Sequence, residues 1–284
     1  MAAAAIRRTR RWRIAAAACL ALAPRIAGAV IVAAGAGDSK PPAPDPGVAR
    51  VAIIAGLSGV YLGNGRVLTA GHVLAAARNQ KKGDALIGGH SYPLDLASAV
   101  RLESKDGKAD LVLVRIEGDP GLPPISISSR TPPIGERLVL AGNGPLQESR
   151  RACWDASGRP APDAQPGVRC GFAWRKTPEG KTNGLQWGTN QVASTGEILP
   201  GPEGARTRVF VTLFRDGLPT PREAQAGVGD SGGPVFVETG SGHELAGILL
   251  GVSARSQGAA LFGDRTYAAD LSAYRGQILD ALAP

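Results

Sequence analysis

The hexapeptide GDSGGP (Gly229–Pro234) lies between a run of small residues, AQAGV (224–228), and the apolar run VFV (235–237). A serine among glycines is common in tight turns. It also occurs where side chains must be absent so that a substrate carbonyl can approach a nucleophile. Because a serine hydroxyl is a weak nucleophile at neutral pH, the second interpretation needs a base in contact with it and a group that orients the base. The rest of the chain must hold these partners if Ser231 is reactive.

The composition favours an all-β fold. The chain of 284 residues contains 39 glycines and 22 prolines, and only 5% of its residues are aromatic. Short strand-like runs separated by turns recur through residues 48–117 and 137–270, with a Pro/Gly-rich connector at 118–136 between them. This pattern is typical of barrels and sandwiches. A helix is expected at the C-terminal end, where Asp270 is a suitable N-cap and four apolar residues share one helical face: Leu271, Tyr274, Ile278 and Leu282.

The N-terminal segment is interpreted as an export signal covering residues 1–29. It has an arginine-rich start and an apolar run at 14–23 that is too short to span a bilayer, and Ala27-Gly28-Ala29 offers a cleavage site. Ala34-Gly35-Ala36 is a second candidate site, and Sec export is favoured over twin-arginine export. A Pro/Gly-rich spacer is expected at residues 30–47. No later run is long enough for a transmembrane helix, so a secreted or periplasmic protein without a stable membrane anchor is predicted.

The net charge of +8 does not indicate a nucleic-acid partner. Six arginines and no acidic residue fall in the predicted signal, and without them 26 basic residues face 24 acidic ones. The basic excess therefore belongs to the leader rather than to a binding face.

In the exported part, Cys153 and Cys170 form an even pair, which favours a disulfide. No histidine neighbours either cysteine at ligand spacing, so neither a metal nor a cofactor is predicted.

The search for a base is short because the chain has three histidines. His90 and His243 lie in turn-like contexts and are interpreted as solvated loop residues. His72 follows the strand-like RVLTA (66–70) and precedes a short apolar run, although a histidine in such a place is often structural. Asp110 precedes the apolar run LVLVRI (111–116) and starts at the edge of the core, where it could orient an imidazole or make only local hydrogen bonds. Asp106, in a turn-like stretch, is the weaker candidate.

The order of the three candidates is informative. His72, Asp110 and Ser231 follow one another in an order that differs from those of the α/β-hydrolases and the subtilisins. LTAGHV (68–73), ADLVLVRI (109–116) and GDSGGP closely resemble the motif regions of the chymotrypsin/trypsin-like serine peptidases. The resemblance extends over residues 48–284. It implies two six-stranded antiparallel β-barrels, at 48–117 and 137–284, with the site in the cleft between them and a C-terminal α-helix.

The resemblance also implies a role for each residue. Ser231 would attack the scissile carbonyl, His72 would accept its proton and pass it to the leaving amine, and Asp110 would orient His72. The backbone N–H groups of Gly229 and Ser231 would form the oxyanion hole. In this family the residue six positions before the nucleophile, here Gln225, lies at the base of the primary pocket and carries no charge that would select a basic residue.

The strand that pairs with substrate would be Leu250-Gly251-Val252. In digestive members a new N-terminal amine pairs with the acid before the nucleophile, here Asp230. Arg50-Val51 resembles such a cut site, but it lies too close to His72 in the sequence, so internal donors to Asp230 are expected.

The leading hypothesis is an exported serine endopeptidase that acts on protein or peptide substrates. The alternative is a catalytically silent peptidase fold that serves as a binding or scaffold module.

Overall fold

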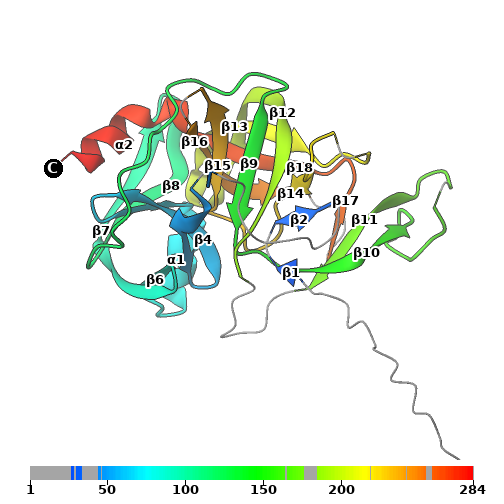
Figure 1. Ribbon diagram of the computed structural model, residues 1–284, viewed down its shortest axis with the longest axis horizontal. Helices are drawn as coiled ribbons and strands as arrows, with labels where there is room; N and C mark the ends of the chain where they lie inside the picture. The colour runs from blue at the N-terminus through cyan, green and yellow to red at the C-terminus, as the bar shows by residue number, and fades with distance from the viewer. Residues whose placement is uncertain are drawn as a thin grey trace, which may run out of the picture.

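The computed structural model describes residues 27–28, 30–33, 44–45, 47–163, 165–175, 184–217, 219–240, 242–253 and 258–283 (Figure 1). Most of the predicted export signal, residues 1–26 and 29, lies outside the described residues. Within the described part, no helix is both long enough and apolar enough to cross a membrane.

The first barrel is a closed sheet of six antiparallel strands in the order β3-β4-β5-β8-β7-β6. Its interior is filled by apolar side chains such as Leu62, Leu68 and Leu102, which are fully buried. The turn between β4 and β5 contains Asn64 and Gly65, both with positive φ, which is the conformation of a tight hairpin turn. The strands are β3 (Val51–Ile54), β4 (Leu57–Gly63), β5 (Arg66–Thr69), β6 (Asp84–Ile87), β7 (His90–Ser104) and β8 (Gly107–Ile116).

The second barrel closes in the order β12-β13-β18-β16-β15-β9. Leu140, Phe210 and Leu249 belong to its buried core. Its strands are β9 (Arg137–Gly142), β12 (Gln186–Pro200), β13 (Arg206–Leu213), β15 (Pro234–Thr239), β16 (Gly242–Val252) and β18 (Arg265–Asp270). The two closed six-stranded barrels confirm the fold predicted from the sequence.

The predicted C-terminal helix is present but does not begin as an α-helix. The Asp270 carboxylate accepts a hydrogen bond from the Ser272 backbone N–H and caps a 3₁₀ turn, η3 (Leu271–Ala273). The α-helix, α2 (Arg275–Leu282), follows after Tyr274. The four apolar residues predicted to share one face are all buried: Leu271, Tyr274, Ile278 and Leu282.

A long hairpin extends from the second barrel (Figure 1). It consists of β10 (Leu146–Trp154) and β11 (Arg169–Arg175), and it joins β1 (Ala27–Gly28) and β17 (Ala259–Leu261) in a four-stranded sheet. Cys153 and Cys170 are directly opposite each other on this hairpin and form a disulfide, as predicted. The disulfide ties β10, whose residues are mostly exposed or partly buried, to β11, where Cys170, Gly171 and Phe172 are buried.

Part of the predicted spacer is built into the second half of the molecule. Strand β2 (Ile31–Val32) pairs with β14 (Ala224–Gln225), and both of its residues are buried. The Gln147 side chain accepts a hydrogen bond from the Val32 N–H and donates one to the Val32 carbonyl, each at 2.8 Å. Strand β14 lies a few residues before the GDSGGP loop in the sequence, so β2 pairs with the segment that leads into this loop.

Candidate active site

His72 is placed by the junction between a strand and a helix. Strand β5 ends at Thr69, and helix α1 (Gly71–Asn79) begins two residues later. The backbone N–H of His72, in the first turn of the helix, donates a hydrogen bond to Asp110 Oδ1 at 3.0 Å. A side chain would not fit at Gly71, because a Cβ atom there would lie 2.8 Å from Asp110 Oδ1.

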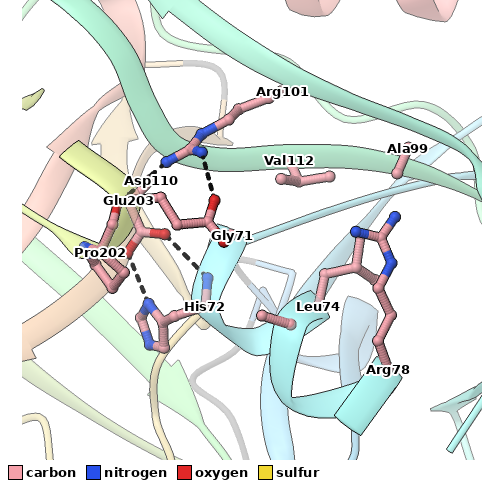
Figure 2. Close-up of a pocket in the computed structure, with 11 residues that line it drawn as sticks. Gly71, His72, Leu74, Arg78, Ala99, Arg101, Asp110, Val112, Pro202 and Glu203 are labelled. Carbon is pink, nitrogen blue, oxygen red and sulfur yellow. Dashed lines mark hydrogen bonds and ion pairs between the residues drawn. The ribbon is translucent and has the colours of Figure 1, made fainter. Parts of the chain in front are cut away.

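The imidazole of His72 contacts the carboxylate of Asp110 (Figure 2). His72 Nδ1 lies 2.7 Å from Asp110 Oδ2, the histidine side chain is 28% exposed and the aspartate side chain is 7% exposed. With its proton on Nδ1, the ring donates to the carboxylate and leaves the lone pair of Nε2 free to accept a proton from a hydroxyl. The negative charge of Asp110 would stabilise the imidazolium formed in that transfer.

Ser231 lies in the loop between β14 and β15, on the second barrel, and this loop contacts the first barrel. The backbone N–H of Ser58, on β4, donates to the Ser231 carbonyl at 2.9 Å, and the Ser58 hydroxyl donates to the Gly229 carbonyl at 3.2 Å. A Cβ atom at Gly232 would lie 2.3 Å from Thr69 Oγ1, at the end of the strand that leads to His72. The loop is therefore packed against the segment that carries the histidine.

The Ser231 hydroxyl makes no hydrogen bond to His72 or to any other described residue. Ser231 itself is only partly buried. Hydrogen bonds between a nucleophile and its base are often long or poorly aligned without substrate, so geometry of this kind does not exclude a nucleophilic role. The sequence predicts that the three residues act together. In the structure, a hydrogen bond joins His72 and Asp110, and the loop of Ser231 packs against the first barrel, which carries both of them.

Gly229 adopts a backbone conformation that favours glycine. Its φ is +117°, and a Cβ atom there would lie 3.1 Å from the Cα of Gly144. A side chain would therefore meet both a backbone strain and a close neighbour. The absence of a side chain at Gly229 therefore has a physical reason in the conformation and packing of the loop.

Asp230 is fully buried in a cradle of glycines. The Gly227 N–H donates to Asp230 Oδ2 at 2.7 Å, the Gly144 N–H is a second donor, and Oδ1 accepts no hydrogen bond from a described residue. A Cβ atom at Gly142 or Gly144 would overlap the carboxylate. Burial raises the pKa of Asp230 to about 7, and the two backbone donors only partly oppose that effect. Internal donors to this carboxylate were expected, and two of them are present.

The residues assigned to the primary pocket are linked through strand β18: the N–H of Ala226, next to Gln225, donates to Thr266 Oγ1, and Thr266 pairs with Val252. Gln225 is almost completely buried on β14, and its Oε1 has no hydrogen-bond partner among the described residues. Leu250, Gly251 and Val252 form the end of β16, where Gly251 and Val252 are partly exposed. A neutral side chain with a free acceptor at the base of a pocket would not favour a basic substrate residue through an ion pair.

A separate pocket of about 180 Å³ adjoins the His72–Asp110 pair. It runs from the histidine along α1 to Arg78, and Ser231 is not among the residues that line it (Figure 2). Its wall includes Arg101 of β7 and Glu203 of the 3₁₀ turn η2 (Pro202–Gly204), which form an ion pair at 2.9 Å between the two barrels. Sequence reasoning missed these lining residues because no motif marks them.

The other candidates from the sequence have different partners. Asp106 lies in the turn between β7 and β8 and forms an ion pair with Arg208 at 2.7 Å. His90 is exposed at the start of β7, and His243 is partly exposed on β16. None of the three contacts the His72–Asp110 pair.

A family comparison agrees with the fold. Residues 57–248 match the family model of the trypsin-like peptidase domain. Among solved structures, the inactive form of the Rv3671c protease shares 14% identity and a TM-score of 0.48, with 82% of this chain and 89% of that chain covered. An inactive serine-to-alanine mutant of Rv3671c from M. tuberculosis H37Rv shares 15% identity and a TM-score of 0.49, with coverage of 89% and 99%. No curated protein matches the chain.

Proposed function

The chain belongs to the family of trypsin-like peptidase domains, and from this premise we propose that it is an exported serine endopeptidase with His72, Asp110 and Ser231 as its catalytic residues. The observation that carries the proposal is the hydrogen-bonded pair of His72 Nδ1 and Asp110 Oδ2 in a member of this family. That arrangement fixes one tautomer of the imidazole and directs the other ring nitrogen outward.

The proposed reaction has two steps. Ser231 Oγ attacks the carbonyl carbon while its proton passes to His72 Nε2, and the oxyanion is bound by the N–H groups of Gly229 and Ser231. The C–N bond then breaks as His72 returns the proton to the leaving amine, which leaves an acyl group on Ser231. Water then attacks this ester while His72 accepts a proton from the water and passes it to Ser231 Oγ. The ester bond breaks, and the product leaves with a new C-terminal carboxyl group.

The substrate is proposed to be a protein or peptide that lies extended along Leu250–Val252, with one side chain directed toward Gln225. The location is proposed to be secreted or periplasmic. The disulfide between Cys153 and Cys170 supports this location, because such bonds persist in oxidising compartments.

The experiment that tests the proposal is labelling of the purified protein by a serine-directed phosphonate, together with cleavage of a mixed peptide library. We expect the native protein to be labelled on Ser231, and Ser231→Ala to abolish labelling and to lower the cleavage rate by at least about 10³-fold. Ser91→Ala, at an exposed position of β7, is the matched control: it should be labelled and should cleave peptides at the native rate.

One observation favours the second candidate function, a catalytically silent fold that binds a partner. The Ser231 hydroxyl is not hydrogen-bonded to His72 in the free protein. If the native protein is neither labelled nor able to cleave any peptide of the library, the peptidase proposal is wrong and the binding function takes its place.

A further inference from the structure

Asp110 lies at a break in the pairing of its own strand. Strand β8 pairs with β7 at Lys108 and again from Val112 onward, with an irregular register between them, and its pairing with β5 begins at Val112. Ala109 and Asp110 therefore have no opposite residue on either neighbouring strand. Both are buried, so the peptide group between them, with the Ala109 carbonyl and the Asp110 N–H, needs hydrogen-bond partners from elsewhere.

Two side chains supply those partners. Arg101 Nε donates to the Ala109 carbonyl at 2.8 Å, and the Asp110 N–H donates to Thr207 Oγ1, also at 2.8 Å. Thr207 is completely buried, and it lies on β13 of the second barrel, 97 residues from Asp110 in the sequence. The main chain of the aspartate is thus attached to the barrel that also carries Ser231.

The same contact region is reinforced from the second barrel. Arg101 forms its ion pair with Glu203 (Figure 2). A Cβ atom at Gly201 would lie 3.5 Å from the Cβ of Asp110. The segment from Gly201 to Thr207 therefore packs directly behind the aspartate. A change in the relative position of the barrels would be transmitted to the carboxylate through these contacts.

We propose that Thr207 is a positioning residue: its hydroxyl holds the Asp110 main chain and so keeps the carboxylate aligned with His72 Nδ1. This inference rests on the proposed function, in which Asp110 orients His72. Without the hydroxyl, the buried N–H would lose its acceptor, and the main chain would move toward another one. The carboxylate would then stabilise the imidazolium less, which lowers the affinity of His72 for a proton and slows proton transfer from the serine.

The test compares three variants of the full chain. Thr207→Val has the same shape but no acceptor, and Thr207→Ser keeps the hydroxyl. Thr212→Val is the matched control: Thr212 is buried on the same strand, and its hydroxyl has no hydrogen-bond partner among the described residues. The readouts are the NMR titration of the His72 imidazole, its Nδ1 proton resonance, and the pH profile of kcat/KM.

In Thr207→Val we expect His72 to titrate at lower pH than in the native protein and its Nδ1 proton resonance to move upfield. We also expect kcat to fall roughly 3- to 30-fold with little change in KM. Thr207→Ser should restore the native titration and most of the rate, and Thr212→Val should resemble the native protein in every readout. If Thr207→Val does not fold, Thr207→Ala provides the same comparison, because it also removes the hydroxyl acceptor and its side chain is smaller than the native one.

The inference is wrong if Thr207→Val is merely less stable, with the His72 titration and the acid limb of the pH profile equal to those of Thr212→Val. Because the NMR titration needs no turnover, it decides the role of Thr207 even in a protein that cleaves nothing. A failure of the peptidase proposal is therefore distinguishable from a failure of this one.

Discussion

Among single residues, Asp230 has the most unusual environment. Its carboxyl group is fully buried among glycines, and no cationic side chain in the described part of the chain pairs with it. An ionised carboxylate is costly to bury without a counter-charge, so the folded protein favours the protonated form. The group lies directly before Ser231 in the sequence, and its two backbone donors, Gly227 and Gly144, belong to the segments that shape the same loop.

The raised pKa of Asp230 predicts a dependence of stability on pH. In the unfolded chain the group loses its proton near its usual pKa of 3.8, whereas the folded protein holds it up to about pH 7. Between these values the folded state binds more protons, so the free energy of unfolding should decrease as pH rises and level off above pH 7. The full effect is on the order of 4 kcal/mol.

Asp230→Asn should remove this slope, because the amide does not titrate. Urea denaturation of both proteins between pH 4 and pH 8 measures it, and the variant should gain stability relative to the native protein toward pH 8. Parallel curves for the two proteins would contradict the prediction.

At the scale of elements, the barrels and the C-terminal helix were predictable from the sequence, whereas the extended hairpin and the short strand β2 were not. The short strand-like runs separated by turns and the three motifs indicated both barrels, and the spacing from Leu271 to Leu282 indicated the buried face of the C-terminal helix. The extended hairpin was not predictable as two long strands. Its run LQESRRACW (146–154) is mostly polar, and the hairpin projects from the barrel, so no apolar alternation marks it. The strand β2 in the predicted spacer was equally hidden, since it is only two residues long.

The disulfide is the covalent link within the extended hairpin. Cys153 and Cys170 close a loop across a sequence separation of 17 residues. In the chain-entropy model this restriction of the unfolded state contributes about 3 kcal/mol. We therefore expect the double variant Cys153→Ser/Cys170→Ser to lose about 2–4 kcal/mol in free energy of unfolding while both barrels remain folded at 25 °C.

Urea denaturation with far-UV circular dichroism measures this loss. The native protein under reducing conditions is the control, and it should approach the double variant. Equal midpoints for the oxidised native protein and the double variant would show that the bond does not stabilise the fold.

At the scale of the molecule, the candidate site depends on two contact regions between the barrels. In one, the segment from Gly201 to Thr207 packs behind Asp110. In the other, Ser58 of the first barrel contacts the loop of Ser231, and its hydroxyl also accepts a hydrogen bond from the Asn143 N–H at 2.9 Å. The sequence indicated which residues would react, but not how the barrels are held together. A lone threonine such as Thr207 or a lone serine such as Ser58 has no local pattern, and its partner lies far away in the sequence.

The second contact region leaves no room for a methyl group. A Cβ atom at Gly232 would lie 2.0 Å from the Ser58 carbonyl oxygen and 2.3 Å from Thr69 Oγ1, and the φ of Gly232 is +85°. Gly232→Ala must therefore strain the loop and push it away from the first barrel. We expect kcat/KM to fall at least about 10²-fold, because a displacement of about 1 Å in a nucleophile is enough for such a loss. The free energy of unfolding should fall by about 2–4 kcal/mol.

Gly240→Ala is the control, since a Cβ atom there would have no neighbour within 4 Å and the position is a surface turn of the second barrel. Peptide cleavage and urea denaturation of the two variants measure the effects. We expect Gly232→Ala to lose peptide cleavage at temperatures where it is still fully folded, and Gly240→Ala to cleave as the native protein does. That result would show that the active site depends on this contact between the barrels. Native activity in folded Gly232→Ala would mean that the loop of Ser231 does not need this close approach of the barrels.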